Sequence, residues 1–164
     1  MKKKDYLDII RYHASDILES DGMGMEKKFI QHGSVSVYDH SVSVAIECLK
    51  IAQYLNIPVD IRSLVRGSLL HDYFLYDWHI SDKSHNWHGF THANVALKNA
   101  LKDFSLNDIE MNMIKCHMFP LNIIPPKYRE GVLLCIADKI VATKETVYPY
   151  VVKLFGREIN LSNN

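Results

Sequence analysis

The chain has 164 residues, 48% of them hydrophobic and 23% charged, and its 19 basic and 19 acidic residues give a formal net charge of zero. This length and composition are typical of one globular domain with a sizeable core. The balanced charge argues against a broad basic face for a nucleic-acid polymer. Because we find no signal peptide and no apolar run of about 18 residues, we expect no membrane association. The three scattered cysteines, Cys48, Cys116 and Cys135, favour a reducing cytoplasm over a disulfide framework.

Apolar residues at helical spacing predict a bundle of about six or seven helices. The first covers about residues 6–18, the Gly22–Gly24 stretch breaks the pattern, and a second short helix covers about 25–31. A helix from about Val37 to Leu55 is apolar on two faces, which predicts a central position. Asp60 is a plausible N-cap for a helix over 61–70. The alternation over residues 35–37 is too short to indicate a strand.

The second half of the chain starts with a segment, about residues 73–89, in which the periodicity fails. Its aromatic content favours an ordered loop of about 16 residues next to a functional site. Thr91 is a candidate cap for a helix over 92–104, and Asn107 with Glu110 resembles a capping box for a helix over 108–117. The last long helix covers about 127–146, and Pro149 ends or kinks it. We therefore expect an all-α fold in one domain over residues 1–164, with its core at roughly 35–146.

Polar side chains that can bind metals lie in or at the end of several of these helices. They are His40, His71, Asp72, His92, His117 and Asp138. Successive helices contribute one candidate each, with His71 and Asp72 adjacent. A lone histidine such as His40 is more often an ordinary core residue. A carboxylate within an apolar helix, such as Asp138, needs a cation or several donors. Together the six predict a metal site.

This order of ligands resembles the HD-domain superfamily of metal-dependent phosphohydrolases over roughly residues 35–146. Residues 137–140 also resemble the final motif of small bacterial members that cleave dinucleoside polyphosphates. The resemblance implies a first metal held by His40, His71, Asp72 and Asp138. It implies that Asp72 bridges to a second metal, whose other ligands are His92 and His117. Iron or manganese is usual in the family, and the mixed nitrogen and oxygen ligands also suit cobalt, nickel or zinc.

The resemblance implies a phosphatase or phosphodiesterase that cleaves a phosphate ester or anhydride of a nucleotide or similar small molecule. A hydroxide bridging two metals would be the nucleophile, and Asp72 and Lys139 would act in catalysis, although Lys139 fits a solvated face equally well. His32, His88 and Arg129 are candidate substrate contacts, and His85 and His88 compete with His92 as ligands. Two alternative functions stay open: a di-iron oxygenase of the same superfamily and a non-catalytic nucleotide-binding sensor. The sequence also leaves open whether the chain forms a homo-oligomer and which substrate it binds.

Overall fold

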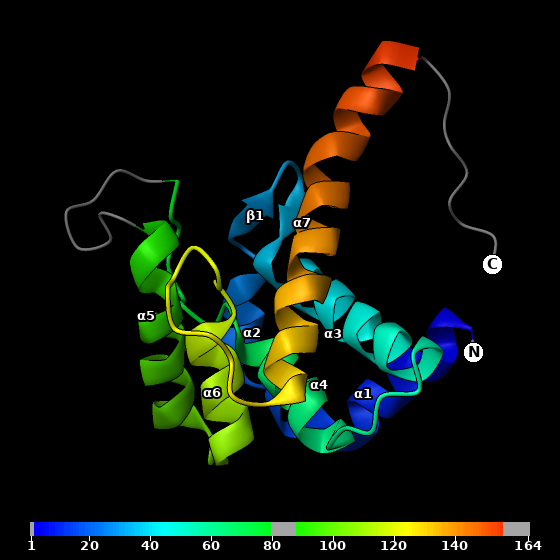
Figure 1. Ribbon diagram of the computed structural model, residues 1–164. Helices are drawn as coiled ribbons and strands as arrows, with labels where there is room; N and C mark the ends of the chain where they lie inside the picture. Colours follow the sequence, from blue (N-terminus) through cyan, green and yellow to red (C-terminus); the bar gives the residue numbers. More distant parts are fainter. Residues whose placement is uncertain (1, 80–87, 156–164) are drawn as a thin grey trace.

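The computed structural model describes residues 2–79 and 88–155, without the side chains of residues 88 and 152–155. Within these ranges the chain forms seven helices and one two-stranded antiparallel hairpin (Figure 1). The helices are α1 (Lys3–Leu18), α2 (Asp21–Glu26), α3 (Val37–Tyr54), α4 (Ile61–Leu70), α5 (His88–Asp103), α6 (Asp108–Cys116) and α7 (Arg129–Phe155), and the strands are β1 (Ile30–His32) and β2 (Val35–Ser36). The predicted all-α class is confirmed.

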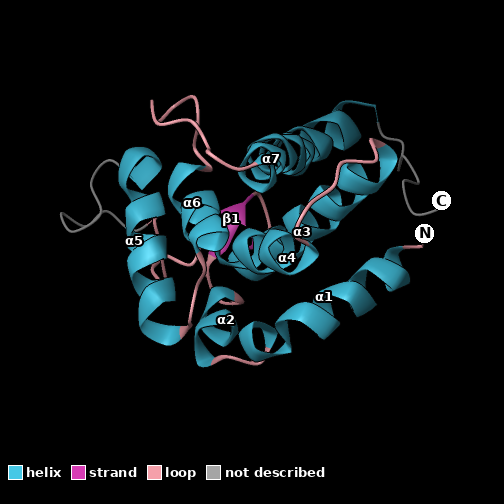
Figure 2. Cartoon of the chain, turned by 60° about the horizontal axis from the view of Figure 1, so that its bottom comes forward, coloured by secondary structure: helices cyan, strands magenta, loops and turns pink. Residues whose placement is uncertain are grey.

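Helix α3 is the centre of the bundle, as its two apolar faces predict. It packs against α1, α4 and α7, and α4 packs in turn against α6. Figure 2 shows α1 crossing one side of the bundle and α5 lying outside α6. Four core side chains of α3 and α4, Val44, Cys48, Leu64 and Leu69, have no exposed surface. This packing fixes the backbone of the helices that carry the candidate ligands.

Side-chain caps mark where α4, α6 and α3 begin. Asp60 accepts a hydrogen bond from the backbone of Ser63 at 2.6 Å, which confirms the predicted N-cap of α4. The predicted capping box before α6 is also present, because Asn107 and Glu110 each accept from the other's backbone N–H. Ser36 caps α3 through the N–H of Asp39 at 3.1 Å.

The prediction for residues 20–36 is wrong in two respects. Gly22 and Gly24 lie inside α2, whose N-cap is Ser20, and the chain then forms the hairpin instead of a helix over 25–31. Gly22 is required by packing, because a Cβ there would overlap the ring of Tyr73. Gly33 closes the hairpin with a φ of +59°. The short strands depend on tertiary contacts with α3 and α7, which the local sequence does not reveal.

The start of α5 and the end of α7 differ most from the prediction. Helix α5 begins at His88, four residues before the predicted start, so it takes up the end of the predicted loop; residues 80–87 of that loop lie outside the described residues. Helix α7 continues to Phe155 instead of ending near residue 146 or at Pro149. A proline's fixed φ is compatible with a helix, so α7 can continue through Pro149, although the ring removes one backbone hydrogen bond and crowds the carbonyl four residues earlier. None of the helices in the described ranges combines the length and apolar character needed to cross a bilayer.

Candidate metal centre

The six candidate ligands come from five helices or helix ends and meet in the interior. His40 is in the first turn of α3, His71 caps the C-terminus of α4 and precedes Asp72, and His117 caps the C-terminus of α6. His92 lies in α5 and Asp138 near the middle of α7. Their side chains are between 0% and 14% exposed. The structure therefore brings together all six residues that the sequence singles out.

Asp72 lies at the centre of the cluster, and each of its two oxygens faces a different pair of histidines. Its Oδ1 is 3.3 Å from His92 Nε2 and 3.5 Å from His117 Nε2. Its Oδ2 is 3.4 Å from His71 Nε2 and 3.9 Å from His40 Nε2. Two groups of residues at metal-ligating distance thus share one carboxylate. A carboxylate in this position can bridge two cations.

Asp138 joins the group that contains His40 and His71. Its Oδ1 lies 3.2 Å from His40 Nε2 and 3.8 Å from His71 Nε2. This side of the cluster therefore offers two imidazoles and two carboxylates, whereas the other offers two imidazoles and the second oxygen of Asp72, Oδ1. A mixed nitrogen and oxygen set of this kind suits divalent transition metals better than Mg²⁺ or Ca²⁺.

The second ring nitrogen of three of the histidines has a partner that orients the ring. His71 Nδ1 donates to the carbonyl of Ser68 at 2.7 Å, and His117 Nδ1 donates to that of Ile114 at 2.8 Å. Both acceptors belong to the last turn of a helix, where carbonyls lack an intrahelical partner. His40 Nδ1 lies 2.8 Å from Glu145 Oε2. With the proton on Nδ1, the lone pair of each Nε2 faces the centre, as metal ligation requires.

The chemistry of the inward-facing atoms fits a bound metal. His71 Nε2 and Asp72 Oδ1 are buried, and neither has a hydrogen bond within the described part of the chain. The Nε2 atoms of His92 and His117 lie 2.9 Å apart and face the same carboxylate oxygen. Buried acceptors without a hydrogen-bond donor cost free energy of folding. A cation on either side of Asp72 would satisfy them.

The electrostatics of the metal-free cluster point the same way. Burial opposes charge on His40 and Asp138, but hydrogen bonds to Asp138 and Glu145 raise the pKa of His40 to about 10. Burial likewise opposes ionisation of Asp72, yet His71, His117 and His92 hold its pKa well below the usual value. The pKa of Asp138 is lowered by its contacts with His40 and His71. The cluster therefore favours a positive charge beside ionised carboxylates, which a metal ion would supply in place of a proton.

Three residues that the sequence analysis did not single out approach the cluster. Glu145 orients His40 and lies two helical turns after Asp138, so its spacing of seven residues was a usable signal. Gln31 on β1 donates from Nε2 to Asp72 Oδ2 at 2.5 Å. Glu26 at the end of α2 is fully buried, and this burial together with the Asp72 carboxylate raises its pKa well above the usual value. The position of Gln31 depends on the hairpin and that of Glu26 on the packing of α2, so the local sequence pattern predicted neither.

The predicted substrate contacts fall in different places. The half-buried ring of His32 lies edge-on to His40, with centroids 5.5 Å apart, and within ligating distance of Glu145. Arg129 donates to the carbonyl of Pro58 at 2.8 Å and begins α7 nine residues before Asp138, about 13 Å along the helix axis. Among the described residues, no hydrogen bond or ion pair joins Arg129 to the cluster. The side chain of His88 lies outside the described residues.

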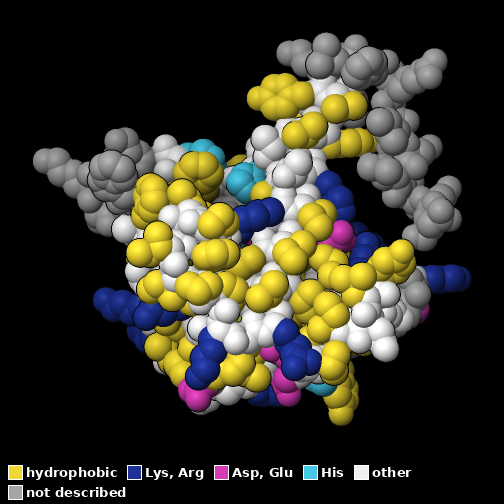
Figure 3. Space-filling view, in the orientation of Figure 1, with side chains coloured by type: hydrophobic (Ala, Val, Ile, Leu, Met, Phe, Trp, Pro, Cys, Tyr) yellow, Lys and Arg dark blue, Asp and Glu magenta, His cyan; other side chains and the backbone are white. Residues whose placement is uncertain are grey.

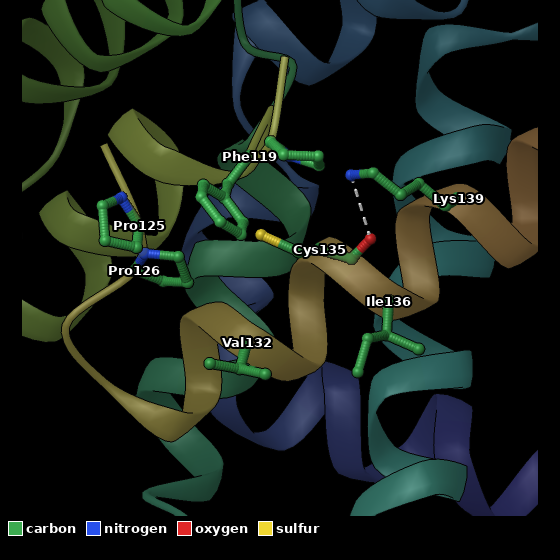
Figure 4. Close-up of a pocket in the computed structure, with 8 residues that line it drawn as sticks. Phe119, Pro125, Pro126, Val132, Cys135, Ile136 and Lys139 are labelled. Carbon is green, nitrogen blue, oxygen red and sulfur yellow. Dashed lines mark hydrogen bonds between the residues drawn. The ribbon is translucent and has the colours of Figure 1, made fainter. Parts of the chain in front are cut away.

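Lys139 lies on the rim between the cluster and an apolar cavity. Its Nζ donates to the carbonyls of Cys135 at 3.2 Å and His117 at 3.4 Å. Figure 4 shows its side chain running along α7 toward Cys135, at one edge of the cavity. The cavity has a volume of about 350 Å³, and its other lining residues include Phe119, Pro120, Pro125, Pro126, Val132 and Ile136. On the visible face in Figure 3, hydrophobic side chains surround this region.

The comparison with known families identifies the class of protein. Residues 37–143 match the family model of the HD domain, which covers most of the chain and all six clustered residues. The chain therefore belongs to the HD-domain family, whose members are mostly metal-dependent phosphohydrolases. Comparison with curated proteins and with solved structures gives no match. Glu26, Gln31, His32 and Glu145 lie outside the matched segment.

Proposed function

We propose that this protein is a phosphohydrolase that uses two metal ions to cleave a phosphate ester or anhydride of a nucleotide or similar small molecule. The observation that carries the proposal is Asp72, whose two oxygens face two separate pairs of buried histidines. Membership of the HD-domain family supports the same class of reaction. Two positive charges beside one carboxylate suit a substrate that carries a phosphoryl group.

The protein's own groups would hold and orient the ions. His40, His71, Asp72 and Asp138 would bind one ion, and His92, His117 and the other oxygen of Asp72 would bind the second. We propose iron or manganese, with cobalt, nickel or zinc as alternatives. When bound, such ions neutralise phosphate charge and lower the pKa of water near the phosphorus. The three oriented histidine rings would keep this geometry rigid during turnover.

Residues on the rim of the cluster are candidates for holding the substrate. Lys139 would contact a phosphate oxygen, since its Nζ lies 3.4 Å from the carbonyl of the ligand His117. His32 would approach from the hairpin beside His40. The roles of His88 and Arg129 in substrate binding stay predictions.

The bulk properties suit a small-molecule substrate. A net charge of zero gives no reason to expect a nucleic-acid polymer as partner. All three cysteines are buried free thiols, which suits a reducing compartment, and we propose a cytoplasmic location on that ground. Assembly into a homo-oligomer is compatible with these observations and is not required by them.

Phosphate release from a panel of nucleotides, dinucleotides and phosphate monoesters tests the proposal. The protein would be supplied with Mn²⁺ or Fe²⁺ under anaerobic conditions, so that oxygenase chemistry does not contribute. We expect turnover that stops on chelation and is absent in Asp72→Ala, because this substitution removes a ligand from both ions. Asp8→Ala is the matched control, since Asp8 lies on the exposed surface beside Arg11. Release by Asp72→Ala at the wild-type rate would contradict the proposal.

A further inference from the structure

Strand β1 buries its polar residue and exposes its apolar one. Gln31 is 8% exposed, whereas the neighbouring Ile30 is 39% exposed. Successive side chains of a strand point to opposite faces, so a shift of one residue would bury Ile30 instead. Burial of an amide without all of its hydrogen bonds costs free energy, and hydrophobic packing alone therefore favours the other orientation. The reason for burying Gln31 has to lie in the contact that it makes inside the protein.

An irregularity of the hairpin places Gln31 in this orientation. Ile30 pairs with Ser36 and His32 pairs with Val35, so two steps along β1 correspond to one step along β2. Gln31 is thus the additional residue of a bulged strand, and bulges redirect side chains and are frequent beside active sites. Because the hairpin packs against α3 and α7, which carry two of the candidate ligands, the redirected side chain reaches the candidate metal centre.

The contact joins Gln31 to the carboxylate at the centre of the cluster. Its Nε2 donates to Asp72 Oδ2 at 2.5 Å, and the nitrogen must face Asp72 because an ionised carboxylate only accepts hydrogen bonds. Asp72 Oδ1 has no hydrogen bond within the described ranges, and it faces His92 and His117, which together define the His92 side of the cluster. The two oxygens of Asp72 therefore have different surroundings: the amide fixes one, and the other is free to ligate.

We infer that Gln31 is a positioning residue, which sets the rotation of the Asp72 carboxylate and so aims Oδ1 at the ion on the His92 side. This inference rests on the proposed function, because it needs an ion on each side of Asp72. On the His92 side, Oδ1 is the only carboxylate oxygen among the clustered residues that the structure describes, whereas Asp138 supplies a second carboxylate on the other side. Loss of the amide should therefore weaken mainly the ion on the His92 side.

Gln31→Met tests this role, because methionine keeps the length of the side chain and has no N–H to donate. Titration calorimetry with Mn²⁺ would compare the variant with the wild type. We expect the affinity of one site to fall by about 10- to 100-fold, the usual effect of losing a hydrogen-bond partner of a metal ligand, and the other site to stay unchanged. Gln53→Met is the matched control and should change neither site. It also removes a side-chain hydrogen bond, with Tyr6 at 2.6 Å, but lies about 20 Å from His40 along α3.

The weakened site is identified in a background that lacks it. The double variant His92→Ala/His117→Ala removes both imidazoles of the His92 side, and Gln31→Met added to it should not change the affinity for the remaining ion. The effects of the substitutions are then non-additive, as expected for groups that act on one site. If Gln31→Met weakens the remaining ion as strongly as it weakens binding in the wild type, the amide does not act on the His92 side and the inference is wrong.

Thermal unfolding of the metal-free protein separates positioning from folding. Gln31 Oε1 is buried without a donor in the part of the chain that the structure describes, so removal of the amide also removes an unsatisfied group. We expect the Tm of Gln31→Met to equal or exceed that of the wild type. A Tm lowered by several degrees, with both metal sites weakened equally, would assign Gln31 a structural role and overturn the inference.

The outcomes distinguish this inference from the proposed function. A wild type that binds two ions, with the same two affinities in Gln31→Met, refutes the role of Gln31 and leaves the two-ion phosphohydrolase standing. A wild type that binds fewer than two ions contradicts the proposed function, and the inference fails with it. Two ions in the wild type, one of them selectively weakened in Gln31→Met, support both.

Discussion

At the scale of single residues, the proposed metal centre depends on the second ring nitrogen of three of its histidines. The helix-end carbonyls of Ser68 and Ile114 hold His71 and His117 in one tautomer, and a carboxylate does the same for His40. A partner of this kind fixes the ring's orientation and increases its basicity as a ligand. We therefore propose Glu145 as a positioning residue for an ion on the His40 side; it lies two helical turns from the candidate ligand Asp138.

Glu145→Gln is expected to weaken one metal site selectively. The neutral amide keeps the shape of Glu145 but loses the charge that holds His40, so we expect metal affinity there to fall by roughly 10- to 100-fold. Titration calorimetry with Mn²⁺ would resolve this as one weakened site and one unchanged site. Glu47→Gln is the control, because Glu47 pairs with Lys144 on the surface nearby. Equal affinity in Glu145→Gln and wild type would contradict this role.

The pKa of His40 predicts how the stability of the metal-free protein depends on pH. Because its pKa is about 10 in the folded chain and 6.5 as the reference value, the folded state binds the additional proton between these limits. The stabilisation is therefore complete below pH 6.5 and is lost as the pH rises toward 10. We expect the free energy of unfolding, measured in urea with chelator present, to fall between pH 7 and pH 9.5. His40→Gln should show a much flatter dependence, and an unchanged slope in that variant would exclude His40 as the cause.

At the scale of elements, the segment before α3 brings the hairpin and α2 against the ligand-bearing helices. Helix α2 can approach the residue after Asp72 only because Gly22 has no side chain, since a Cβ would overlap the Tyr73 ring. The hairpin then carries Gln31 to Asp72 and His32 to His40. The close approach at Gly22 therefore supports the wall of the site that lies outside the family match.

Substitution of the two glycines of α2 tests this packing. Gly22→Ala should destabilise the protein by about 1–3 kcal/mol, the usual cost of overpacking. Gly24→Ala is the matched control in the same helix, because a Cβ there meets nothing within 4 Å. It should be neutral or stabilising by up to about 1 kcal/mol through helix propensity. Urea unfolding of both variants checks the difference, and equal stability of the two would show that α2 does not pack tightly on Tyr73.

At the scale of the whole molecule, the sequence predicts those helices whose apolar periodicity and caps agree. This holds for Val37–Tyr54 and Ile61–Leu70, where dense apolar spacing coincides with a polar cap. The hairpin escaped prediction because strands of three and two residues have almost no periodicity and depend on distant helices for support. The end of α7 was predicted too early because Pro149 was expected to end the helix, although the φ angle of proline permits a helix to continue.

The candidate site likewise has residues that local patterns predict and residues that only tertiary contacts reveal. Its six histidines and aspartates could be located because each ends or interrupts an apolar helix at a spacing of about one helix and one connection. The conformation of the segments between the helices determines which other side chains contact these six residues. The periodicity of the sequence does not predict that conformation. Gln31 and Glu26 therefore become visible only in the folded chain, whereas Glu145 could have been found from its position two turns after Asp138.

The central claim is that two metal ions share Asp72, and counting the bound ions tests it most directly. The Mn²⁺ content per chain would be measured by elemental analysis of the wild type, the double variant His92→Ala/His117→Ala, and Asp72→Ala. We predict two ions in the wild type, one in the double variant, and loss of tightly bound metal in Asp72→Ala. A wild type that binds no metal, or the same metal content in all three proteins, would contradict the account.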